Sequence, residues 1–161
     1  MPVDIEDRAL KARKNFEQGY NCAQSVVLAY SDLFGTDEET LLMISSPFGG
    51  GMGRLREVCG AVSGMSMVAG ALERNVNPQD TESKRRCYAL VQKFAERFME
   101  MNGAIVCRTL LGLDREKDSP EPEVRTPQYY KKRPCAMLVE DAARIVGEYL
   151  NSMEEHGPDK V

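Results

Sequence analysis

Residues 59–64 read Cys59-Gly60-Ala61-Val62-Ser63-Gly64, and they open a segment rich in small residues. We predict a helix here, from about Arg56 to Leu72. Its two glycines are four positions apart, so they lie on one face of the helix and leave that face flat. A glycine inside a helix costs about 1 kcal/mol relative to alanine, so a close neighbour must offset that cost. We expect another helix, or a bound cofactor, to lie against Gly60 and Gly64.

The segment just before this helix is rich in glycine and reads Ser45-Ser46-Pro47-Phe48-Gly49-Gly50-Gly51-Met52-Gly53. Glycine reaches backbone conformations that other residues avoid, so we predict a loop. The loop lacks the Lys-Ser/Thr pair of a phosphate-binding P-loop and follows no predicted strand, so nucleotide binding is not expected. We expect the loop instead to bring its backbone close to Cys59.

Helical periodicity surrounds these two segments, and no run shows the alternation typical of a strand. Glycines and capping residues divide the remaining chain into predicted helices at about 5–18, 22–34, 38–44, 81–101, 107–111 and from 134 onward. A polar stretch with four prolines, 114–134, precedes the last of them. We predict an all-α, single-domain helical bundle over residues 1–161, with a core of about 5–153. It carries a Gly-rich loop and a Pro-rich loop before the last helix.

Composition narrows the classes of function. A chain of 161 residues with 42% apolar residues can bury a core without disulfide bonds. A net charge of -4 argues against non-specific nucleic-acid binding. The acidic N-terminus does not resemble a secretory signal, and no apolar run reaches the roughly 20 residues of a membrane span. We therefore expect a cytoplasmic protein, whose thiols are kept reduced.

Four of the five cysteines share a position, because each lies near the start of a predicted helix: Cys22, Cys59, Cys107 and Cys135. Free N–H groups and the helix dipole favour negative charge there, which lowers the pKa of a thiol. Each cysteine also lies beside an apolar stripe, so a role as a small buried hydrophobe stays open. Cys87 lies in the middle of a helix and is expected to serve packing only.

These residues resemble the C_GCAxxG_C_C family of redox-active proteins, over about residues 8–150. The family is defined by four separated cysteines and a Cys-Gly-Ala-x-x-Gly motif, which here is 59–64, preceded by the glycine loop. The other three family cysteines correspond to Cys22, Cys107 and Cys135, and Cys87 has no counterpart.

The resemblance implies a redox or metal-binding role. A similar domain in split-Soret cytochromes is associated with an iron–sulfur cluster, and members are often encoded near transporter genes, which suggests a link to a transporter system. This chain has no Cys-x-x-Cys-His, so haem is not expected.

Three hypotheses for the function follow. In the first, Cys22, Cys59, Cys107 and Cys135 hold an iron–sulfur cluster for electron transfer or redox sensing, with Gly60 and Gly64 against it. In the second, the same cysteines form reversible disulfide pairs, and sequence cannot choose the pairing. In the third, they form a structural zinc site or the chain is an interaction module, which ranks lower because zinc ligands usually come in close pairs.

Several properties stay open at this point. The sequence does not identify the redox partner, and it does not decide whether the protein forms a homodimer. It also leaves open whether the protein is an oxidoreductase or an electron carrier.

Overall fold

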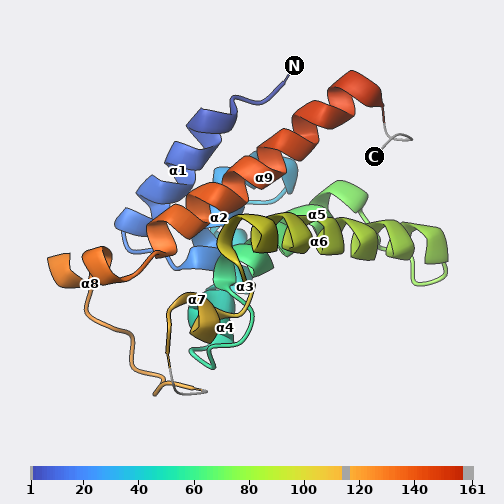
Figure 1. Ribbon diagram of the computed structural model, residues 1–161. Helices are drawn as coiled ribbons and strands as arrows, with labels where there is room; N and C mark the ends of the chain where they lie inside the picture. Colours follow the sequence, from blue (N-terminus) through green and yellow to red (C-terminus); the bar gives the residue numbers. More distant parts are fainter. Residues whose placement is uncertain (1, 114–116, 158–161) are drawn as a thin grey trace.

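Helices α1 (Ile5–Glu17) and α9 (Cys135–His156) lie side by side, and α2 (Cys22–Ala29) packs against both (Figure 1). The computed structural model describes residues 2–113 and 117–157. The all-α prediction is confirmed, since the described residues contain helices and a single isolated β-bridge. Capping explains where the first helix begins, because the Asp4 side chain accepts a hydrogen bond from the N–H of Asp7.

Helix α5 (Gly60–Glu73) joins this group to α6 (Thr81–Asn102), because it contacts α2, α6 and α9. Its glycine face is packed against α2. A Cβ atom at Gly64 would lie 2.9 Å from Cβ of Val26, so only glycine permits this approach. The close neighbour expected from the sequence is therefore a helix. The predicted start of α5 was wrong, because Arg56 has a positive φ of 60° and Val58 forms the bridge with Val106, so the helix begins only at Gly60.

The remaining elements are short. They are η1 (Ser31–Leu33), α3 (Glu38–Ser45), η2 (Ser46–Phe48), α4 (Gly49–Met52), α7 (Cys107–Leu110) and α8 (Pro127–Lys132). Helix α8 was not predicted, because it lies within a proline-rich stretch that reads as a linker. Proline is favoured in the first turn of a helix, and Thr126 caps α8 by accepting from the N–H of Tyr129.

One hydrophobic core joins α1, α2, α5, α6 and α9. Its largest fully buried side chains include Phe16, Tyr30, Met65, Phe94 and Phe98. The Tyr30 hydroxyl satisfies its hydrogen bond inside this core by donating to the carbonyl of Ala143 at 2.7 Å, which ties the end of α2 to α9. Within the described residues, no helix combines the length and the apolar character that crossing a membrane requires.

Candidate functional site

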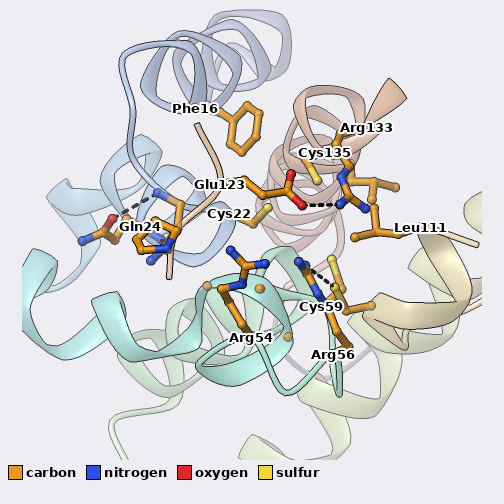
Figure 2. A pocket seen from close by; sticks show the side chains of 18 of the residues that line it. Phe16, Cys22, Gln24, Arg54, Arg56, Cys59, Leu111, Glu123, Arg133 and Cys135 are labelled. Carbon is orange, nitrogen blue, oxygen red and sulfur yellow. Dashed lines mark hydrogen bonds and ion pairs between the residues drawn. The ribbon is translucent and has the colours of Figure 1, made fainter. Parts of the chain in front are cut away.

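The four cysteines singled out from the sequence line one cavity of about 600 Å³ (Figure 2). Cys22, Cys107 and Cys135 are the first residues of α2, α7 and α9, and Cys59 is the N-cap of α5. All are free and buried, with exposed fractions of 4% to 9%. Cys87 does not line the cavity and is half-buried on α6. The fold therefore brings together thiols from four separate segments.

Cys22 is positioned by the cap of its helix. The Asn21 side chain accepts from the N–H of Gln24, and the Gln24 side chain accepts from the N–H of Asn21, which completes a capping box. The same Asn21 amide donates to the carbonyl of Ser46 at 2.9 Å. The start of α2 is thereby fixed against the segment that leads into the glycine loop.

Cys59 and Cys107 are positioned by the β-bridge between Val58 and Val106. The N–H of Cys59 donates to the carbonyl of Ile105 at 2.8 Å, and the N–H of Cys107 donates to the carbonyl of Glu57 at 2.6 Å. In this antiparallel pairing the two cysteines are at diagonal positions, where side chains lie on the same face and within reach of each other.

Cys22 and Cys135 both line the cavity and are neighbours, close enough for a hydrogen-bonding interaction that shifts the pKa of each. This hydrogen bond lowers the pKa of Cys135, and the nearby charges of Arg133, Arg56 and Arg125 lower it further. The same hydrogen bond, together with burial, raises the pKa of Cys22 well above its usual value. Cys22 is therefore the thiol that donates and Cys135 the sulfur that becomes the thiolate.

The other two thiols favour the neutral form. Burial raises the pKa of Cys59 to about 12. Burial also raises the pKa of Cys107, although Arg56 opposes it by donating to the Cys107 sulfur at 3.6 Å. The sequence led us to expect a lowered pKa at all four helix termini, and that expectation was wrong for three of them. At Cys59 and Cys107 the free-energy cost of removing a thiolate from water exceeds the stabilisation that the helix N-terminus provides, and at Cys22 the interaction with Cys135 adds to that cost.

Four arginines also line the cavity: Arg54, Arg56, Arg125 and Arg133. Arg56 donates to the Asp118 carboxylate at 2.8 Å, and Arg133 donates to that of Glu123 at 2.7 Å. Figure 2 shows Arg54 and Arg56 on the side of the cavity opposite Cys22 and Cys135. Sequence reasoning missed Arg125 and Arg133 because both lie in the stretch taken for a linker, where nothing in the local pattern marks them.

The glycine loop forms one wall of the cavity with its backbone in a left-handed conformation. Gly50, Gly51, Met52, Gly53 and Arg54 have φ angles between 57° and 69°. Other residues reach this region at a cost of about 1–2 kcal/mol each, which explains the glycines. The element α4 is thus not a right-handed helix, in agreement with the loop predicted from the sequence.

The two motif glycines differ in their relation to the cavity. Gly60 lines it and also packs closely on α2, because a Cβ there would lie 3.0 Å from Cβ of Cys22. Gly64 packs against Val26 and does not line the cavity. Helix packing accounts for both glycines, and only Gly60 is placed where it could contact a bound group.

The donor set can be compared with what a metal requires. Within residues 2–113 and 117–157, no three His, Cys, Asp or Glu side chains are grouped closely enough to hold one metal ion. A structural zinc site needs four ligands at about 2.0–2.3 Å from the ion, so these side chains would have to shift to form one. An iron–sulfur cluster uses four thiolates shared among its irons. Thiols spread around a cavity therefore fit a cluster better than a single ion.

The fold thus defines the protein as an all-α domain with four free cysteines around one cavity. Residues 20–149 match the family described as Putative redox-active protein (C_GCAxxG_C_C). The chain belongs to this C_GCAxxG_C_C family, as the resemblance of its motif implied. No curated protein and no solved structure was found to match the chain.

Proposed function

We propose that this protein is a thiol–disulfide redox protein in which Cys135 and Cys22 are the reacting pair. The observation that carries the proposal is that both thiols line one cavity as neighbours, with the pKa of Cys135 lowered and that of Cys22 raised. The thiolate is the reactive form of cysteine, so Cys135 is the nucleophile. Cys22 is the resolving thiol because it is the neighbour that interacts with Cys135 inside the cavity.

The reaction uses a disulfide as the oxidant. The Cys135 thiolate attacks one sulfur of that disulfide, a mixed disulfide forms, and the first leaving thiolate takes the electron pair. Cys22 then loses its proton and attacks the Cys135 sulfur, which releases the second thiolate. The products are a Cys22–Cys135 disulfide and two reduced thiols, so two electrons pass from the protein to the substrate. The two sulfur atoms need to approach to about 2.05 Å when the disulfide forms.

Mass mapping of cysteine linkages tests this proposal. Reduced protein is treated with a small disulfide, alkylated, digested and compared with a sample that is reduced again before alkylation. We expect a reversible Cys22–Cys135 linkage, and we expect Cys107→Ser to retain it. Absence of any reversible linkage, or a linkage confined to Cys59 and Cys107, would contradict the proposal.

A second candidate function is electron transfer through an iron–sulfur cluster. It is supported by a separate observation, namely that all four thiols surround one cavity, which is the usual number of cluster ligands. Cys22, Cys59, Cys107 and Cys135 would hold the cluster. A bound cluster would supply one-electron chemistry, and the four lining arginines would offset the negative charge of the thiolates.

The two functions differ in which cysteines they need. Oxygen-free purification followed by iron and sulfide assays and ultraviolet–visible spectroscopy tests the cluster. Cys59→Ser and Cys107→Ser should each remove cluster absorbance, whereas neither should prevent dithiol exchange by Cys22 and Cys135. Colourless, iron-free protein after reconstitution would count against the cluster and leave the dithiol proposal standing.

A further inference from the structure

The segment 117–126 runs along the cavity and contributes several of its lining residues. Pro120 and Pro122 of this segment line the cavity. The segment is fastened to both walls: Arg54 donates to the carbonyl of Glu121, and Arg133 pairs with Glu123 at 2.7 Å. A volume of about 600 Å³ lies in the range of sites that hold small organic molecules. The size of the cavity therefore suits a small molecule.

The lining carries an excess of positive charge. Of the described residues that form it, four are arginines and one, Glu123, is a carboxylate. Asp118 adds a second carboxylate that binds Arg56 at 2.8 Å and Arg54 at 3.5 Å. Two carboxylates against four guanidinium groups leave the cavity cationic, and it therefore favours an anionic occupant.

Arg125 contributes much of this excess. Its guanidinium donates to the carbonyl of Phe16 and to that of Tyr20 at 2.8 Å, and it lies 4.2 Å from the centroid of the Phe16 ring. These partners hold the side chain in place but do not neutralise its charge. In the part of the chain that the structure describes, no carboxylate lies within ion-pair distance of Arg125.

Arg54 has hydrogen-bonding capacity that the fold leaves unused. Its Nε atom is buried and has no hydrogen-bond partner, although the rest of its guanidinium binds Glu121 and Asp118. A buried donor without a partner is costly, and a bound acceptor would remove that cost. Figure 2 shows this guanidinium inside the cavity, on the side facing Cys22.

We infer that the cavity binds a small disulfide bearing carboxylate or similar anionic groups, with Arg54 and Arg125 as its anion-binding residues. The inference rests on the proposed thiol–disulfide function and names its substrate class. Binding brings the disulfide bond to Cys135, and the exchange then proceeds as described above, with the small disulfide reduced to two thiols and Cys135 and Cys22 oxidised. The negative charge of the substrate determines how well it binds in the cavity, and the sulfur atoms of Cys135 and Cys22 carry out the exchange.

Three disulfides of similar length and different charge test this inference: dithiodipropionate (anionic), hydroxyethyl disulfide (neutral) and cystamine (cationic). Reduced full-length protein is mixed with each at low ionic strength, and the rate of Cys22–Cys135 linkage is measured. Each rate is divided by that of the same disulfide with dithiothreitol, because leaving-group pKa also affects exchange. We expect the anionic compound to react about tenfold or more faster than the neutral one, with cystamine slowest.

Variants separate specific binding from general electrostatics. Arg54→Gln should reduce the advantage of the anionic disulfide by at least about threefold, and Arg97→Gln, on α6 outside the cavity, should leave it unchanged. The rate with the neutral disulfide serves as the measure of folding and basal reactivity in each variant. Added salt should reduce the advantage as well.

The outcomes distinguish the two levels of proposal. Equal rates for all three disulfides, or a preference for cystamine, would overturn the anionic substrate class and leave the dithiol function in place. No linkage with any of the three would contradict the dithiol function and this inference together. An advantage that Arg54→Gln and Arg97→Gln reduce equally would overturn the assignment of Arg54.

Discussion

The cavity has two halves that carry the same chemical group in different surroundings. Cys22 and Cys135 begin two helices of the bundle, and an interaction between their side chains shifts the pKa of each. Cys59 and Cys107 flank a β-bridge that keeps them at diagonal positions, and their thiols stay neutral. The comparison shows that the ionisation of each thiol depends on which elements pack around it. The local sequence motif of the cysteine does not determine it.

The largest expected effect concerns the nucleophile. Cys135→Ser should lower the rate of linkage formation with a small disulfide by about a hundredfold or more, because it removes the thiolate. Cys107→Ser should change that rate by less than about threefold, because Cys107 does not touch the pair. Both rates are measured by quenching the reaction with an alkylating agent at timed intervals and analysing the products by mass spectrometry. A similar loss of rate in Cys135→Ser and Cys107→Ser would contradict the distinction between the two halves of the cavity.

The next effect tests the close packing of the glycine loop against Cys107, in the half of the cavity that holds Cys59 and Cys107. Gly51→Ala would place a Cβ 2.6 Å from Cβ of Cys107 and 2.7 Å from the N of Glu57, at a φ of 69°. We expect a loss of about 3–4 kcal/mol in the free energy of unfolding, from strain and overpacking together. Urea unfolding measures it.

Gly53→Ala is the matched control for this substitution. Its φ is also positive, at 57°, but the nearest atom to the added Cβ is the Pro47 carbonyl oxygen at 4.0 Å. Only the backbone strain applies there, so a loss of about 1–2 kcal/mol is expected. Equal losses at Gly51 and Gly53 would show that contact with Cys107 contributes nothing.

A pH series sharpens the contrast in thiol ionisation. The pKa of Cys59 is raised to about 12 in the folded protein. The unfolded chain ionises this thiol from about pH 8.5, so its stabilising contribution is complete below that pH. Above it, unfolding should become easier by about 1 kcal/mol for each pH unit until the folded pKa is reached. The denaturation midpoint at several alkaline pH values measures this slope.

Cys59→Ala provides the reference for that series. The variant lacks the thiol, so its stability should fall less steeply with pH than that of the unchanged protein. Other buried groups, such as Tyr129, whose pKa is raised to about 12, contribute to the slope of both proteins and cancel in the difference. Identical slopes would mean that Cys59 is not held neutral by burial.

The smallest effect concerns the charge beside the reactive half. The Arg133 guanidinium helps to lower the pKa of Cys135. Arg133→Gln should therefore slow alkylation of Cys135 near neutral pH by about threefold, with Arg97→Gln as a control remote from the cavity. Iodoacetamide labelling quantified by mass spectrometry measures the rate, and faster labelling in Arg133→Gln would reverse the assigned role.

Local signals in the sequence were enough to predict the longer helices, although not the exact start of α5 or the short α8, and to place four cysteines near helix starts. Asn21 followed by Gln24 is an example, because a capping box is complete within four residues. The state of the thiols was not predictable in this way. It depends on how deeply each sulfur is buried and on Arg125 and Arg133, which reach the cavity from a stretch with no helical pattern. The bridge between Val58 and Val106 likewise joins residues far apart in the chain.

The left-handed wall of the cavity has a consequence for how the protein can change over evolutionary time. The positive φ angles of this wall are the ones that D-amino acids favour, and ribosomally made proteins contain only L-amino acids and glycine. Replacing glycine by alanine stabilises many loops by reducing the conformational entropy of the unfolded chain. Here the same replacement adds backbone strain, because φ is positive. Mutation therefore has few routes for tightening this wall, and rigidity around the sulfur atoms must be gained from the surrounding helices.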